Sequence, residues 1–251
     1  MLERKYSFDV KQYSTRAEMG AEAAKEAAAV IRELLAKKDE INMIFAAAPS
    51  QNEFLAALIK EEGIDFSRIN AYHMDEYVGL SDDAPQRFGN FLKDHIFGLV
   101  PFRSVNYIQG NAEDIDAECE RYSKLLIDNP TDIVCMGIGE NGHIAFNDPH
   151  VADLHDPKLV KKVSLDEVCR MQQVHDGCFA KLDDVPKYAL TLTVPALAKA
   201  DYHFCVVPAA SKANAVKETV YGPIGEKCPA TALRTCEHAV LYIDNDSGKL
   251  L

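Results

Sequence analysis

The chain has 251 residues, of which 47% are hydrophobic and 26% charged, as in a soluble globular protein with a large core. Its formal net charge of −12 argues against nucleic acid or an anionic membrane surface as a partner, because both require a basic surface. A small anion can still bind, since a few backbone N–H groups and one or two Lys or Arg side chains suffice.

The seven cysteines form no CxxC pair, and several lie within apolar runs such as "DIVCMG" and "YHFCVV". Cysteines of this kind behave as small apolar side chains and are typical of a reduced, cytoplasmic protein. The N-terminal "MLERKYSFDV" contains no apolar signal-peptide region, and no apolar run approaches ~18 residues. We therefore expect a cytoplasmic protein without a membrane-spanning segment.

Helical and extended patterns alternate along the whole chain, with no repeat of fixed period and no linker rich in Pro, Gly or Ser. Apolar residues at helical spacing predict helices, and short unbroken apolar runs predict buried strands. In chain order the patterns predict a helix over 14–38, a strand over 41–48, a helix over 50–63, a strand over 69–74, a helix over 84–97, a strand over 105–110, a helix over 114–129, a strand over 131–139, a strand over 187–194, the start of a helix over 195–200, a strand over 202–208, a helix over 211–222 and a strand over 238–244.

Two of these helices have recognisable start signals. Ser14 or Thr15 is expected to cap the first helix, because a hydroxyl can accept from a free backbone N–H of the first turn. Ser50 and Glu53 occupy the positions of a capping box in the second helix, and Gly63 is expected to end it.

Strands that consist of continuous apolar runs and alternate with helices predict a mostly parallel sheet with helices on both faces. We therefore expect an α/β fold with a single doubly wound sheet, in one domain that spans residues 1–251. In such sheets ligands bind outside the carboxyl ends of the strands. Three segments fall there, namely "IFAAAPSQ", "AYHMDEYVG" and "VCMGIGENGHIAFNDP".

Asp75 and Glu76 directly follow a predicted strand. A carboxylate at such a position can be partly removed from water, which raises its pKa toward the range of a general base. An acidic turn on the surface is the alternative interpretation, because Asp-Glu pairs at strand ends are common.

The loop "GIGENGHIAFNDP" contains three glycines that allow a sharp turn after its strand. His143 changes charge near neutral pH and suits proton transfer, and Asp148 could orient it. The alternative is a Gly-rich turn with a structural histidine. The GxGxxG pattern within the loop does not indicate a nicotinamide site, because "HIAFNDP" follows it instead of a helix.

Two other segments could bind an anion. Ser211 and Lys212 begin a predicted helix, where a hydroxyl, an ammonium and free N–H groups come together. Ser50 begins another, although a cap and a solvent-exposed lysine would explain these residues equally well. The histidines show no metal-binding spacing and no thiolate cluster accompanies them, so no metal is expected.

The motifs "NAYHMDEYVGL", "GIGENGHIAFNDP", "VPKYALTLTVPAL" and "SKANAV" occur in this order along nearly the whole chain. Together they resemble the glucosamine-6-phosphate deaminase/isomerase family, which has a modified Rossmann-like fold. The 6-phosphogluconolactonases share this fold and a Gly-rich "DGH" loop, but "MDEYVGL" and "HIAFN" are similar to the deaminase branch.

The resemblance implies an aldose–ketose isomerisation of an amino-hexose 6-phosphate with loss of ammonia, which gives fructose 6-phosphate. By this resemblance Asp75 is the base that moves a proton between C2 and C1, through an enediol-type intermediate. His143 opens the sugar ring and is held by Asp148, while Lys212 binds the phosphate. No cofactor is implied, which agrees with the residues, because a carboxylate and an imidazole can transfer protons unaided.

The chain departs from the family at four places. Asn141 stands where the family usually has Asp, and Asp148 where it more often has Glu. The phosphate loop is "AAAPSQ" instead of a Gly-rich segment, and Gly177 falls at the position of the usual phosphate-binding Arg. Arg170, Gln172 or Gln173 is expected to compensate. The substrate and phosphate ligands are thus expected to be Ala47, Ala48, Ser50, Gln51, Gly139, Arg170 and Lys212.

Two other functions remain open from the sequence. One is a hydrolase that acts on a phosphosugar lactone, with His143 activating water, and the other is a sugar-phosphate-binding protein without turnover. In each case the partner is a small sugar phosphate, and a monomer or a small homo-oligomer is expected. Allosteric relatives carry a longer C-terminal segment, so we expect no allosteric control.

Overall fold

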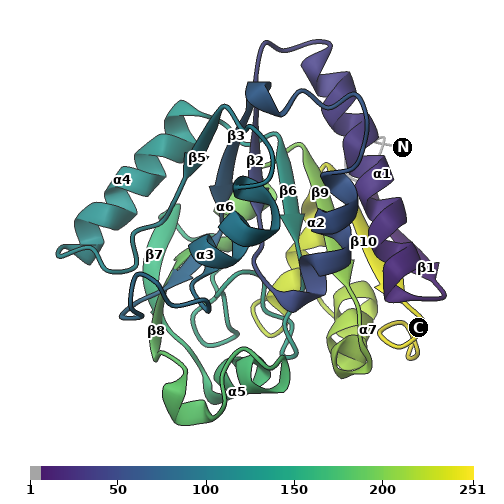
Figure 1. Ribbon diagram of the computed structural model, residues 1–251. Coiled ribbons are helices and arrows are strands. Elements are labelled where there is room, and N and C mark those ends of the chain that lie inside the picture. Colours follow the sequence, from purple (N-terminus) through teal and green to yellow (C-terminus); the bar gives the residue numbers. More distant parts are fainter. Residues whose placement is uncertain (1–6) are drawn as a thin grey trace.

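The computed structural model describes residues 7–251. Its larger sheet has seven strands in the order β1-β10-β9-β6-β2-β3-β5, and all neighbouring strands are parallel (Figure 1). This confirms the predicted α/β fold with a mostly parallel sheet. The strands are β1 (Ser7–Tyr13), β2 (Ile41–Phe45), β3 (Ile69–His73), β5 (Ser104–Asn106), β6 (Ile133–Met136), β9 (Tyr202–Val207) and β10 (His238–Asp244).

Helices cover both faces of this sheet (Figure 1). One core is formed with α1 (Arg16–Leu35), α2 (Asn52–Leu58), α3 (Phe88–Leu92) and its π-helical continuation η3 (Lys93–Phe97). The other is formed with α4 (Ile115–Asp128), α6 (Val194–Ala198), α7 (Ala213–Tyr221) and the 3-10 helix η6 (Pro229–Thr235).

Successive side chains of β2 show how one strand serves both cores. Met43 and Phe45 pack into the first core and Ile44 into the second, because neighbouring residues of a strand point to opposite faces. All three are buried, which explains why the strand is a continuous apolar run in the sequence. No helix of residues 7–251 is long and apolar enough to cross a bilayer.

A second, three-stranded antiparallel sheet was not expected. It consists of β4 (Asp75–Tyr77), β8 (Tyr188–Leu192) and β7 (Val160–Ser164), in the order β4-β8-β7. The strand predicted over 187–194 therefore exists, but it belongs to this sheet. The sequence "VKKVS" of β7 is too polar, and β4 too short, for an apolar pattern to indicate them.

The helix starts differ in how well they follow the sequence signals. Thr15 caps α1 by accepting from Glu18 N, as predicted. The capping box at Ser50 and Glu53 was wrong, because the chain enters α2 through the 3-10 turn η1 (Pro49–Gln51), and no side chain caps either helix. Glu53 instead forms an ion pair with Arg16 at 2.8 Å. This releases the Ser50 side chain to face a cleft.

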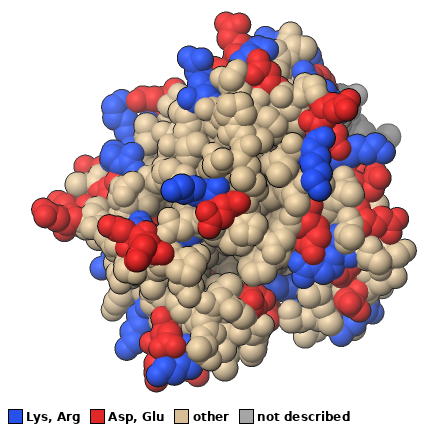
Figure 2. Space-filling model, viewed as in Figure 1, with Lys and Arg blue, Asp and Glu red and all other residues tan. Residues whose placement is uncertain are grey.

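Charged side chains lie mainly around the periphery of the face seen in Figure 2, where acidic and basic groups are interspersed. Near the centre of this face one basic and one acidic group lie side by side, and the surface below them is uncharged and hollowed.

Candidate active site

A cleft lies at the carboxyl ends of the parallel strands. The cleft lies next to β2, where the chain changes the direction in which it adds strands to the sheet. The strand β3 lies on one side of β2, while β6, β9 and β10 follow on the other. Ligand sites of doubly wound sheets form at such a point. The cleft is lined by Ala46, Ala47, Ala48, Ser50, Gln51, Met74, Asp75, Phe88, Gly137, Ile138, Gly139, His143, Ala145, Phe146, Gln172, Gln173 and Lys212.

Asp75 is the buried carboxylate of this cleft. It begins β4, which a single residue separates from β3, and it is only 6% exposed. This burial excludes the alternative that Asp75 belongs to an acidic turn on the surface. Burial, reinforced by the nearby charge of Glu76, raises the pKa of Asp75 well above its usual range. Among residues 7–251 no group donates a hydrogen bond to the Asp75 carboxylate. A carboxylate with these properties is a strong base for its type.

His73 holds the backbone of Asp75 in place. Its Nε2 accepts from the N–H of Ile108 at 2.9 Å, so the proton must be on Nδ1, which lies 2.9 Å from the carbonyl oxygen of Asp75. Complete burial lowers the pKa of His73 to about 4. The ring is therefore neutral at physiological pH. Its two hydrogen bonds link the backbone of Ile108 to that of Asp75.

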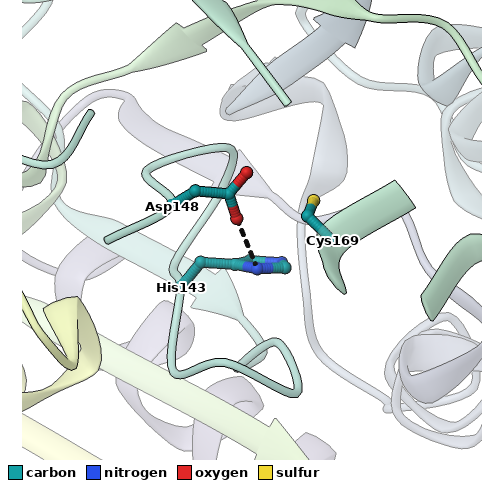
Figure 3. Close-up of side chains that lie close together, drawn as sticks. All are labelled: His143, Asp148 and Cys169. Carbon is teal, nitrogen blue, oxygen red and sulfur yellow. Dashed lines mark ion pairs between the residues drawn. The ribbon is translucent and has the colours of Figure 1, made fainter. Parts of the chain in front are cut away.

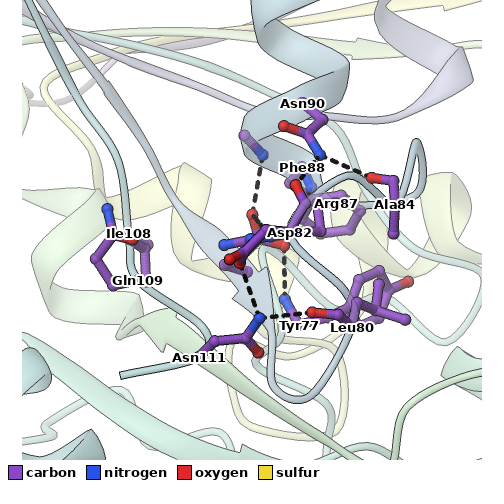
Figure 4. Close-up of polar contacts among 12 residues, drawn as sticks. Tyr77, Leu80, Asp82, Ala84, Arg87, Phe88, Asn90, Ile108, Gln109 and Asn111 are labelled. Carbon is purple, nitrogen blue, oxygen red and sulfur yellow. Dashed lines mark hydrogen bonds and ion pairs between the residues drawn. The ribbon is translucent and has the colours of Figure 1, made fainter. Parts of the chain in front are cut away.

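Glu76 holds the segment that brings Phe88 to the cleft. Its carboxylate accepts from the backbone N–H groups of Tyr77, Phe88 and Gly89 at 2.9, 3.1 and 2.9 Å. Burial raises the pKa of Glu76, although these three hydrogen bonds oppose the rise. Figure 4 shows the surrounding contacts, in which Asn111, Asp82 and Asn90 tie the loop between β4 and α3 together. This network fixes Phe88, whose ring lines the cleft.

His143 lies in the loop that follows β6. Its Nδ1 is 2.7 Å from Asn141 Oδ1. The same nitrogen is 3.0 Å from Asp148 Oδ1, and Figure 3 shows this second contact. Both partners are acceptors, so Nδ1 must carry the proton. In the neutral form of the ring, Nε2 is then the unprotonated nitrogen. A histidine in this state can take a proton from a ligand and return it.

Asp148 lies behind His143 and is fully buried. Burial alone would raise the pKa of Asp148, but hydrogen bonds from His143, Asn141 and the backbone N–H of Asp166 lower it, as does the charge of the His143 ring when that ring is protonated. Asp148 is thus ionised beside the ring. The sequence placed Asn141 and Asp148 in the site, and the structure places both behind the imidazole, outside the lining of the cleft.

Two groups of potential metal ligands lie in this region: His143, Asp148 and Cys169, and Asp148, His150 and Asp166. The Cys169 thiol lies near Asp148 and the His143 ring (Figure 3). Burial and the nearby carboxylates Asp148 and Asp166 raise the pKa of Cys169 well above its usual range, so the thiol keeps its proton. With Nδ1 of His143 also protonated, the first group suits proton transfer better than metal binding.

Lys212 supplies the cation of the cleft. It closes the 3-10 turn η5 (Ala210–Lys212) before α7 and is only 4% exposed. Its Nζ has no hydrogen-bond partner within the described chain. Burial lowers the pKa of Lys212, while the more distant Asp176 and Glu140 oppose this effect. A buried ammonium without a partner is costly, and an anion in the cleft would relieve that cost.

Replacing Lys212 with Met should therefore separate stability from binding. We expect K212M to melt at a higher temperature than the wild type without ligand, since the unpartnered charge is gone. Stabilisation by inorganic phosphate should need about 10- to 100-fold more phosphate. Thermal melts across a phosphate titration measure both effects. K217M, on the exposed side of α7, is the matched control, and equal phosphate responses in both variants would refute an anion site at Lys212.

The structure brings most of the predicted ligands together but not Arg170. Gln172 and Gln173 line the cleft. The Arg170 guanidinium instead donates to the carbonyl oxygens of Leu182 and Val185, at 2.7 and 2.9 Å. Arg170 lies on α5 (Glu167–His175), about 200° around the helix from Gln172. Its guanidinium is committed to these carbonyl groups and does not line the cleft.

Several functional positions were missed by the sequence analysis. Met74, Phe88 and Phe146 form the apolar lining, and apolar residues next to a motif carry no signal that separates a cleft from a core. Asp166, which contacts Asn141, was also missed. In the sequence, Asp166 stands three positions before Cys169 at the start of a helix. This pattern predicts an N-cap and gives no sign of a contact with Asn141.

The chain is similar to known proteins in sequence and in fold. The sequence model of the family described as glucosamine-6-phosphate isomerases/6-phosphogluconolactonase matches residues 14–242. The chain is 30% identical over 238 residues to a glucosamine-6-phosphate deaminase of Streptococcus pyogenes serotype M1, which covers 92% of this chain and 95% of the relative. It is also similar to the solved structure of a monomeric glucosamine-6-phosphate deaminase, with a TM-score of 0.87 and 30% identity over 97% of this chain and 100% of that one. A 6-phosphogluconolactonase of Thermotoga maritima shares the fold, with a TM-score of 0.76 at 18% identity over 95% of this chain and 100% of that one.

Proposed function

Because the chain belongs to the glucosamine-6-phosphate isomerase/6-phosphogluconolactonase family, we propose that it converts glucosamine 6-phosphate and water into fructose 6-phosphate and ammonia. The observation that carries this proposal is the convergence of Asp75, His143 and Lys212 on one cleft. These three residues provide a base, a proton shuttle and an anion ligand, which are the groups the reaction needs.

The chemistry assigned to these residues starts with ring opening. Nε2 of His143 accepts the proton of the sugar O1 hydroxyl and returns it to the ring oxygen, which frees an aldehyde at C1. Asp75 then takes the proton from C2 while O1 gains a proton from water, which gives an enolamine. Asp75 delivers its proton to C1 while the nitrogen loses a proton to water, which gives a ketimine at C2. Water adds to the ketimine and ammonia leaves, which gives fructose 6-phosphate.

The phosphate group is proposed to lie between Lys212 and the turn that carries Ser50 and Gln51. Lys212 Nζ is the unpartnered donor there, and the hydroxyl of Ser50 lines the same cleft. The apolar side chains of Phe88 and Phe146 would pack against the sugar carbons and exclude water from Asp75. We further propose that the protein acts in the cytoplasm as a monomer or small homo-oligomer, and that it requires no cofactor.

The purified protein should be assayed for ammonia release with glucosamine 6-phosphate, galactosamine 6-phosphate and glucosamine. We expect ammonia and fructose 6-phosphate from the first, and no turnover of the last, which has no phosphate for Lys212. Rapid hydrolysis of 6-phosphogluconolactone without any ammonia-releasing activity would favour the lactonase alternative. Ligand-induced thermal stabilisation without product from any substrate would favour a binding protein.

A further inference from the structure

The Asn141 side chain uses its whole hydrogen-bonding capacity inside the site. Its Oδ1 accepts from the backbone N–H of His143 at 3.0 Å and from Nδ1 of the same residue at 2.7 Å. Its Nδ2 donates to Asp148 Oδ1 and Asp166 Oδ2, both at 3.1 Å. Because an amide has one accepting and one donating end, the two carboxylates and the backbone N–H together determine which way round it lies.

Asp166 is itself held firmly where it meets Asn141. It caps α5, since its Oδ1 accepts from the N–H of Cys169 at 2.6 Å. Its own backbone N–H donates to Asp148 Oδ2 at 3.1 Å. One carboxylate oxygen is therefore committed to the helix, and the other is directed at the amide of Asn141.

We propose that Asp166 is a positioning residue for the His143 imidazole: through Asn141 it keeps a second oxygen, beside that of Asp148, against Nδ1, which favours the tautomer with the proton on Nδ1 and leaves Nε2 free. The family resemblance placed a carboxylate at position 141. In this chain the amide of Asn141 stands between the His143 ring and the carboxylate of Asp166. Asp166 therefore acts on the ring through that amide. The kinetic consequences rest on the proposed function, whereas the tautomer itself does not.

The variant D166N isolates this role. Its amide oxygen can still accept from Cys169 N, so the cap is kept, but an NH2 group now faces the NH2 of Asn141. Two facing donors push the Asn141 amide away from Asp166, which weakens the contact of its oxygen with Nδ1 of His143. We expect kcat to fall about 10- to 100-fold with little change in KM. D166S keeps a capping oxygen and introduces no opposing NH2, so its kcat should fall much less.

In the N141D variant, the substitution D166N should change kcat in the opposite direction. In N141D a third carboxylate joins Asp148 and Asp166, and repulsion among them lowers kcat. Adding D166N to N141D replaces one of these carboxylates by an amide whose NH2 can donate to the carboxylate at position 141, and it should raise kcat. D166N thus lowers kcat in the wild type and raises it in N141D. The same direction of change in both backgrounds, or equal activities of D166N and D166S, would overturn the proposal.

The tautomer of His143 can be read without any substrate. The 15N chemical shifts of its ring nitrogens, assigned by their loss in H143Q, should show Nδ1–H in the wild type and D166S and a larger fraction of Nε2–H in D166N. Circular dichroism and thermal melts check that each variant is folded. An unchanged tautomer in folded D166N refutes the role of Asp166 even if the protein deaminates its substrate. A changed tautomer in a protein without deaminase activity supports that role and refutes the proposed function instead.

Discussion

Replacing Asp75 with Asn should lower kcat by about 1,000-fold or more, because a general base contributes about 10²- to 10⁴-fold to a proton transfer. The amide has nearly the same shape as the carboxylate but cannot take the proton from C2. Wild-type kcat/KM should also fall on acidification at a pH well above the usual range of a carboxyl group, since burial and Glu76 raise the pKa of Asp75. Steady-state assays from pH 5 to 9 measure both effects.

The same substitution should make the protein more stable at neutral pH. A raised pKa means that the folded state holds the Asp75 proton more tightly than the unfolded state does. The stability that this proton provides is present at low pH and is lost as the pH rises through the raised value. D75N lacks this loss, so its free energy of unfolding should exceed that of the wild type by a margin that widens above about pH 4.

Urea unfolding of wild type and D75N at several pH values tests this trend. D183N is the matched control, because Asp183 is exposed in the 3-10 turn η4 (Leu182–Asp184). We expect D183N to retain wild-type kcat and the wild-type dependence of stability on pH. If D75N keeps most of the activity, Asp75 is not the base. If the stability margin does not depend on pH, its carboxylate is not desolvated.

Replacing Gly139 with Ala should inactivate the protein through the imidazole it contacts. A Cβ atom at this position would lie 2.1 Å from Cε1 of His143 and 2.3 Å from each ring nitrogen. The backbone cannot move aside freely, because Gly139 N donates to the carbonyl oxygen of His143 at 2.9 Å. The ring must therefore leave its place beside Asn141 and Asp148. A displacement of about 1 Å in a catalytic group costs about 100-fold in rate, and we expect at least this loss in kcat.

G225A is a matched control, because a Cβ at Gly225 would meet no atom within 4 Å. Its kcat should equal that of the wild type. The ring 15N shifts of His143 should change in G139A and stay unchanged in G225A, and phosphate should still raise the melting temperature of both, since Lys212 is not displaced. Normal turnover by G139A would show that His143 does not act from the position seen in the structure.

The alternation of helices and strands, and the edge of the sheet where ligands bind, followed from the sequence. Unbroken runs such as "TDIVCMGIG" identify strands that are buried on both faces. Gly-rich and acidic residues directly after such strands must lie at the carboxyl edge, because the strands are parallel. The order of residues along the chain is enough for these conclusions, since each depends only on a local period and on the direction of a strand.

Contacts between distant segments were decided by the tertiary structure alone. Asp75 is buried because β4 pairs with β8, more than 100 residues away in the chain, and Asp166 reaches Asn141 from the start of α5. Arg170 was expected at the phosphate but turns to carbonyl groups on the other side of its helix. Local patterns reveal which residues are buried or begin a helix. Whether a buried polar group finds a partner depends on the packing of remote elements. Within residues 7–251 this packing leaves Lys212 Nζ without a hydrogen-bond partner and gives His143 its tautomer.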